Sequence, residues 1–161
     1  MKENITRRSF VAGIAALATG CVGGPSVDES APIQERLRQR AAVGMDGVMS
    51  SGHTTQVRDT DDGYGVTVSY LLPTAGDKLS VKNALTNVAE AFYTSPDANV
   101  VESVEIQASM ELVNEYGEKG KYVVGRGRLN ADEARRINWD NATIQMVWRH
   151  AENKSFREGV M

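Results

Sequence analysis

Cysteine, histidine and long apolar runs are scarce in this chain. It has one Cys and two His, so it forms no internal disulfide, and these residue types alone cannot supply the four ligands of a zinc site. No apolar run reaches the roughly eighteen residues of a bilayer span, which predicts that no membrane-spanning helix is present. Basic residues form no block, so we expect no nucleic-acid partner.

What remains is the composition of an ordinary globular domain. The chain has 161 residues, 41% of them apolar, with 18 Lys and Arg against 21 Asp and Glu. This length and balance predict one domain with its own hydrophobic core.

The first twenty residues are organised like a targeting segment. Arg7 and Arg8 precede a short apolar stretch, and small residues at positions 18–20 lead to Cys21. The arginine pair, with Phe10 two positions after it, resembles a twin-arginine (Tat) export signal. The small residues before Cys21 resemble a lipobox, the cleavage site of a lipoprotein precursor. The apolar stretch is too short to remain as a membrane anchor.

The resemblance to a Tat-exported prokaryotic lipoprotein implies a location and two contacts. It implies passage through the Tat translocase, removal of residues 1–20, and a lipid on Cys21 that anchors the chain to the extracytoplasmic face of the cell membrane. Removal of residues 1–20 takes away three basic residues and one acidic residue, so the net charge changes from −3 to −5. With Arg more frequent than Lys, the mature chain resembles small surface lipoproteins of haloarchaea, whose functions are uncharacterised. The alternative is a cytosolic protein in which Cys21 is a buried thiol.

The rest of the chain divides into a tether, a domain and a tail. Small and polar residues without an apolar period predict a flexible tether over residues 21–31. A single α+β domain is expected over residues 32–157, followed by a C-terminal tail over residues 158–161. Its first helix begins at Pro32 and is expected to end near Val43. A second, strongly amphipathic helix follows from residue 76 and stops before residue 96.

A first β-hairpin is predicted around the turn cluster at residues 59–63. β-rich runs flank this cluster, and apolar residues alternate with polar ones in the second run. Pairs whose residue numbers sum to 123 place Val57 opposite Val66 and His53 opposite Tyr70.

A second β-hairpin is predicted from strict alternation after residue 104. Pairs whose residue numbers sum to 233 keep the apolar residues of positions 104–112 on one face and the polar ones on the other, and a slip by one residue would scramble both faces. Two glycines on the buried face leave room for a helix to approach closely. The predicted pairs are Met110–Val123, Ala108–Gly125, Gln107–Arg126, Ile106–Gly127 and Glu105–Arg128.

A last helix completes the expected order α-β-β-α-β-β-α. Asn130 and Glu133 form a capping-box pattern at its start, and a break is expected near residues 139–141. The order predicts an α+β fold, in which a four-stranded, mainly antiparallel sheet made of two hairpins carries helices packed on one face. The strand order stays open.

The opposite face of the sheet is the predicted binding face. Arg126 and Arg128 are expected to pair across the strands with Gln107 and Glu105, and we favour such solvated pairs over an anion site. The predicted binding face consists of Thr67, Ser69, Glu105, Gln107, Ser109, Arg126 and Arg128.

Other candidate sites carry little chemistry. His53 and His150 are far apart in sequence, and no Ser or Cys lies in a nucleophile motif. Residues 59–63 superficially resemble a calcium loop, but no Glu follows at its twelfth position, so we expect a turn and no metal. Asn141 and Asn153 begin glycosylation acceptor patterns.

Two functions of different classes follow. The first is a lipid-anchored, extracytoplasmic, non-catalytic domain that binds an envelope partner without a cofactor. The alternative is a cell-envelope hydrolase that uses a Glu or Asp with a His. We favour the first because no nucleophile, metal set, phosphate loop or cofactor motif is visible. A deep pocket that holds His53 or His150 beside a carboxylate would favour the enzyme, and a flat open sheet would favour the binding domain.

Overall fold

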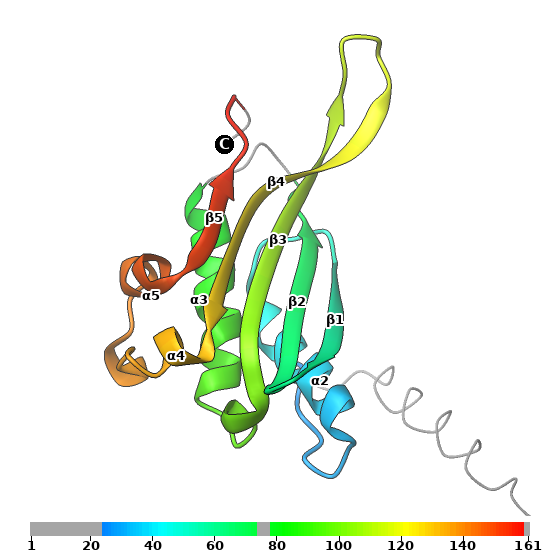
Figure 1. Cartoon of the computed structure of the whole chain (residues 1–161). Coiled ribbons are helices and arrows are strands. Elements are labelled where there is room, and N and C mark those ends of the chain that lie inside the picture. The colour runs from blue at the N-terminus through cyan, green and yellow to red at the C-terminus, as the bar shows by residue number, and fades with distance from the viewer. Residues whose placement is uncertain (1–23, 74–77, 160–161) are drawn as a thin grey trace, which may run out of the picture.

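The computed structural model describes residues 24–73 and 78–159, and the predicted signal and lipidation residues Arg7, Arg8, Phe10 and Cys21 lie outside this part. The described part has an α+β arrangement (Figure 1). In chain order its elements are α2 (Ile33–Met45), β1 (His53–Thr60), β2 (Gly63–Leu71), α3 (Lys78–Tyr93), η1 (Ala98–Val100), β3 (Val101–Val113), β4 (Lys119–Asn130), α4 (Ala131–Ala134), η2 (Trp139–Asn141), α5 (Ile144–His150) and β5 (Glu152–Phe156).

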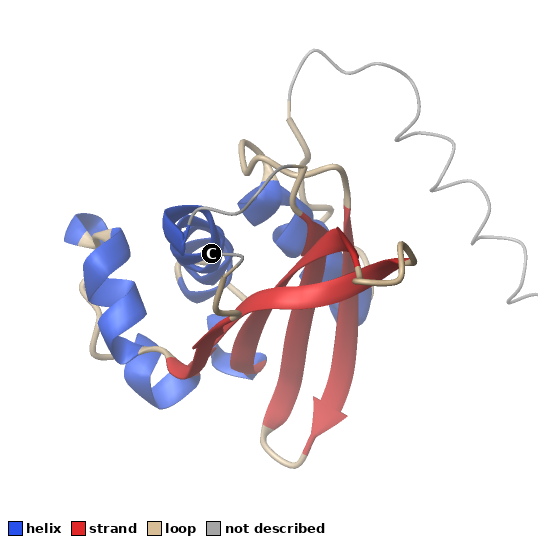
Figure 2. Ribbon diagram, turned by 90° about the horizontal axis from the view of Figure 1, so that it is seen from above, coloured by secondary structure: helices blue, strands red, loops and turns tan. Residues whose placement is uncertain are grey.

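The sheet contains five strands in the order β1-β2-β3-β4-β5. Three neighbouring pairs are antiparallel, and β2 and β3 are parallel. The prediction of four strands is therefore wrong, and the sheet is mixed. The parallel pair arises because the crossover through α3 returns the chain to the end of the sheet where β2 began. The expected α+β class is confirmed, and the helices gather along one side of the sheet (Figure 2).

The register of the first hairpin is confirmed. In β1 and β2, His53 pairs with Tyr70 and Val57 pairs with Val66. Val66, Val68 and Tyr70 are buried, whereas the residues between them in β2 are half-buried. The alternation in sequence thus marks the two faces of the sheet correctly.

The register of the second hairpin is confirmed up to a bulge. Glu105 pairs with Arg128 as predicted, and the predicted pairing holds as far as position 108 of β3. Beyond it the register shifts by one, so Met110 pairs with Tyr122 instead of its predicted partner. Val124 is the extra residue of this β-bulge, and it is buried.

Two glycines bring the helices close to the sheet, as the sequence predicts. A Cβ on Gly127 would lie 2.6 Å from the ring of Trp148 in α5, and one on Gly125 would lie 2.9 Å from the side chain of Val81 in α3. The core is therefore formed where α3 and α5 cover β4 directly.

A third glycine fixes the contact between the first two helices. Gly44 lies in the last turn of α2, where a Cβ would come within 2.6 Å of the Val88 Cα in α3. Glycine usually weakens a helix, which is why an end near Val43 is expected from the sequence. The helix continues to Met45 because this close approach buries Gly44 and Met45.

The C-terminal region differs from the single broken helix that the sequence predicts. It forms α4, η2, α5 and the fifth strand. Asn130 makes no side-chain cap for α4, and its Nδ2 donates to Glu152 Oε2 at 2.6 Å instead. Thr143 caps α5 by accepting a hydrogen bond from the Met146 amide. The strand β5 is polar and mostly exposed, so no apolar alternation marks it in the sequence.

A nearly buried carboxylate joins α2 to the connection between α3 and β3. Asp97 accepts a hydrogen bond from Arg36 at 2.7 Å and another from Arg40 at 2.8 Å. The side chains of Asp97 and Arg40 are only 7% and 8% exposed. Hydrogen bonding from Arg36, with a further contribution from Arg40, lowers the pKa of Asp97 below its ordinary value, although burial acts in the opposite direction.

Candidate functional site

The open face of the sheet, on the side away from the helices, carries the predicted binding residues in two adjacent rows. Residues in register on neighbouring strands point to the same face, so each row forms one continuous strip. The first row consists of Thr67, Glu105 and Arg128, and the second of Ser69, Gln107 and Arg126.

Most side chains of these rows reach solvent. Arg126 is exposed, and within the described part of the chain its side chain makes no hydrogen bond or ion pair. The other five are half-buried because neighbouring strands flank them. The face is therefore accessible, with one guanidinium group available for a partner.

The side-chain contacts on the face differ from the expected cross-strand pairs. Gln107 Nε2 donates to Glu105 Oε1 at 2.7 Å along the same strand. Arg128 Nε donates to Asn130 Oδ1 at 3.0 Å, also along its own strand. The residues predicted to face each other do so in register, but neither predicted side-chain pair is formed.

Ser109 is the exception among the predicted face residues. It lies in register between Leu71 of β2 and Val123 of β4, and it is only 6% exposed. Its small side chain lies between two larger ones on the same face, so Ser109 offers little surface to a partner.

The structure extends the open face by residues that the sequence interpretation left out. Thr54 and Gln56 of β1 pair with Ser69 and Thr67, and Arg58 lies one row further along β1. The sequence contains enough information to find them, because pairing residues whose numbers sum to 123 in the first hairpin already places them on this face. Glu152 in β5 pairs with Arg128, but no pattern in the sequence marks that strand.

No known protein family, curated protein or solved structure matches this chain. In the part that the structure describes, no helix is long and apolar enough to cross a membrane.

The two histidines have different environments. His53 is exposed at the start of β1. His150 Nδ1 lies 2.7 Å from Glu133 Oε2, and the second oxygen of Glu133 pairs with Arg136 at 2.8 Å. A carboxylate therefore does lie beside one histidine, and the contact joins α4 to α5.

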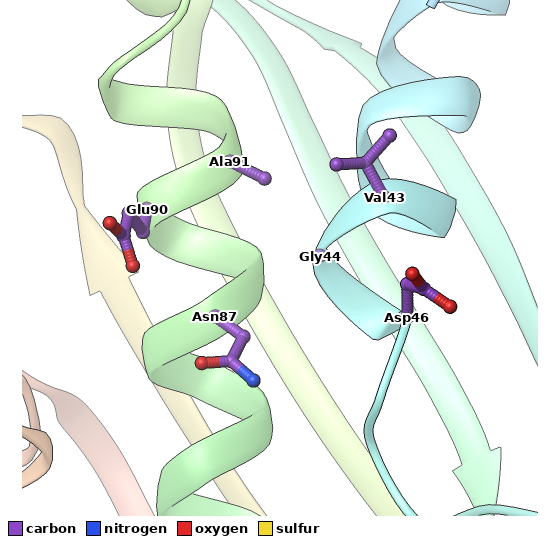
Figure 3. Close-up of a pocket in the computed structure, with 6 residues that line it drawn as sticks. All are labelled: Val43, Gly44, Asp46, Asn87, Glu90 and Ala91. Atoms are coloured by element: carbon purple, nitrogen blue, oxygen red, sulfur yellow. The ribbon is translucent and has the colours of Figure 1, made fainter. Parts of the chain in front are cut away.

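Two cavities are present on the described surface, and the larger one shares Arg128 with the open face. A polar cavity of about 450 Å³ at one end of the sheet is lined by residues that include Glu102, Arg128 and Arg135. A smaller one, about 250 Å³, lies between α2 and α3 and is bounded by Asp46 and Glu90 (Figure 3). Neither cavity is lined by a histidine.

The remaining predicted sites lie on the surface. Asn141 is exposed in η2, and Asn153 is exposed in β5 with a φ of 48°. Both positions are open to solvent, and their glycosylation stays a prediction. Residues 59–63 form the end of β1 and the turn into β2. Among residues 24–73 and 78–159, no three His, Cys, Asp or Glu are placed to hold a metal ion.

Proposed function

We propose that this protein is a lipid-anchored, extracytoplasmic, non-catalytic protein that binds an envelope protein through the open face of its sheet. The observation that supports this proposal is the arrangement of that face. Helices cover one side of the sheet, and the other side presents polar side chains in adjacent rows. An open polar sheet face suits contact with another protein better than enclosure of a small substrate.

The charges on the open face indicate the chemistry of the partner. Arg58, Arg126 and Arg128 outnumber Glu105 and Glu152, so the face has a small positive excess. A free guanidinium forms strong, charge-assisted hydrogen bonds with carboxylates. We therefore expect the partner to present an acidic surface.

The contact between His150 and Glu133 is the observation that favours a hydrolase as the second candidate. A carboxylate that orients a histidine is a common part of general-base catalysis. The pair borders neither cavity, and Glu133 also binds Arg136. In this setting the contact connects α4 to α5, and we favour the binding function.

Site-specific photo-crosslinking on intact cells tests the binding function. A photo-reactive amino acid is placed at Gln56 or Gln107 on the open face, and at Arg38 on α2 as a matched exposed control. We expect the same crosslinked protein from both face positions, no product from Arg38, and loss of the product when Arg126→Glu is added. Equal products from all three positions would contradict the assignment of the face.

A further inference from the structure

We propose that residues 24–31, which the sequence predicts to be part of a flexible tether, form a fixed stalk, so that a lipid on Cys21 holds the C-terminal end of α2 against the bilayer. The surface that faces the lipid then carries Val43 and Met49. This inference rests on the proposed lipid anchor. It adds an orientation of the domain and a second contact with the membrane.

Contacts along α2 hold residues 28–31, the second half of the stalk, in place. The Asp28 amide donates to Gln39 Oε1 at 2.7 Å, and the Glu29 carboxylate pairs with Arg40 at 2.8 Å. Arg36 also donates to the Ala31 carbonyl at 3.1 Å. Arg36 and Arg40 are themselves held by the carboxylate of Asp97. The stalk is thus connected to the core through charge-assisted hydrogen bonds, which are stronger than neutral ones.

The stalk brings the start of the described chain to the far end of α2. A Cβ on Gly24 would lie 2.7 Å from a carboxylate oxygen of Asp46, the residue that follows α2. Only two residues separate Gly24 from Cys21. Three Cα-to-Cα steps span at most about 11 Å, so the lipidated residue stays within that distance of Gly24.

The surface around this point suits contact with neutral lipid headgroups. Met49 is 71% exposed and Val43 is 37% exposed, although both residues are apolar. Both lie within three residues of Asp46 in the chain, and Figure 3 shows Val43 beside Asp46 on the cavity between α2 and α3. Glu90 lines the same cavity. Carboxylates repel anionic lipids, so the geometry points to a zwitterionic bilayer surface as the occupant.

This orientation leaves the proposed binding face free. The helix α2 packs on the helix-covered side of the sheet, and the open face lies on the other side. The tip of the β3–β4 hairpin, where Tyr116 is 81% exposed, lies far from α2 (Figure 1). A partner can therefore reach the open face while the end of α2 rests on the bilayer.

Fluorescence quenching on the full-length, lipidated protein in phosphatidylcholine vesicles tests the orientation. Single-label variants Met49→Cys and Tyr116→Cys carry an environment-sensitive fluorophore, and the vesicles contain a lipid with a nitroxide in its headgroup. We expect several-fold stronger quenching at position 49 than at position 116. Equal quenching at the two positions, in protein that still binds the vesicles, would overturn the orientation and leave the lipid anchor intact.

Two further variants test the stalk itself. Glu29→Ala combined with Gln39→Ala removes two stalk contacts but keeps Asp97 and both of its arginines. A Gly-Ser insert of about twelve residues before Gly24 adds roughly 20 Å of flexible reach. Each change should bring the quenching ratio close to one, and an unchanged ratio in both variants would refute the stalk. Failure of the unmodified lipid-bearing protein to bind vesicles at all would refute the proposed anchor, and the orientation with it.

Discussion

A single side chain, that of Asp97, connects α2 to the segment between α3 and β3. Its carboxylate is nearly buried and binds both Arg36 and Arg40. Asp97→Asn keeps the shape but removes the charge, and it leaves Arg40 buried with only Glu29 as an anionic partner. Loss of one partner of a buried pair typically costs about 3–5 kcal/mol, and we expect the lower end of this range. Urea unfolding of the soluble fragment that starts after Cys21 measures this loss.

The stability that Asp97 contributes should also depend on pH, and Asp97→Asn should lack this dependence. The pKa of Asp97 is lowered in the folded state, so its contribution to stability is complete above its ordinary pKa of 3.8 and is lost as the pH falls through the lowered value. Between about pH 6 and about pH 3, the wild type should therefore lose more stability than Asp97→Asn. An identical loss in the two proteins would contradict this role of the carboxylate.

Ile106 and Glu105 test the two faces of the sheet at neighbouring positions. The side chain of Ile106 is fully buried, whereas Glu105 is half-buried on the open face and binds Gln107. Ile106→Asp places an unpaired charge in the core, so we expect a loss of several kcal/mol from a total of about 5–15 kcal/mol. Glu105→Ala should cost less than about 1 kcal/mol. Thermal melts compare the two, and a larger loss for Glu105→Ala would mean that the faces are reversed.

At the scale of elements, the contact between α2 and α3 depends on the absence of a side chain at Gly44. Gly44→Ala puts a Cβ 2.6 Å from the Val88 Cα, and backbone atoms at this contact cannot move aside easily. We expect a loss of about 1–3 kcal/mol from overpacking, even though alanine favours helix formation. Gly65→Ala is the matched control, since its nearest neighbour would be 3.5 Å away. Equal melting temperatures for the two variants would rule out the close approach.

The elements that the sequence predicts well are those with a periodic apolar pattern. The register of β1 with β2 and most of that of β3 with β4 followed from alternation, because a slip would have moved residues such as Ile106 out of the core. The bulge at Val124 was missed, since it is an insertion of one residue that alternation alone does not locate. The strand β5 was missed because only Phe156 within it is even partly buried.

The candidate site was predictable to the extent that it depended on the same registers. The rows that contain Glu105 and Gln107 were assigned to the correct face. Their side-chain hydrogen bonds were not predictable. Both Glu105 and Asn130 can accept a hydrogen bond from Arg128, and the side-chain conformation that selects Asn130 cannot be read from the sequence. The burial of Ser109 depends on its neighbours in two other strands.

At the scale of the whole molecule, the order of the strands depends on long-range contacts that no local pattern encodes. The two hairpins join through β2 and β3, whose parallel pairing is set by the crossover through α3. The helices then occupy one side, and the side with the polar rows stays open. This arrangement leaves one side of the sheet accessible, and the proposed function assigns that side to a partner.

Export of this domain is expected to depend on the arginine pair near the N-terminus. Replacing both Arg7 and Arg8 with Lys keeps the charge but removes the guanidinium groups of the predicted Tat signal. We expect the unprocessed precursor to accumulate inside the cell, which immunoblots of fractionated cells would show. Normal export of the double variant would exclude Tat recognition through these residues.

The proposed location of this domain, outside the cytoplasm on a lipid anchor, determines the N-terminus of the mature chain. Mass spectrometry of trypsin-digested membrane fractions can detect the first peptide of the mature chain, which ends at Arg36. We predict a peptide that begins at Cys21 and carries the added mass of a lipid. An unmodified peptide that begins at Ser9 and continues through Cys21 to Arg36 would mean that the chain is neither cleaved before Cys21 nor anchored by a lipid on it.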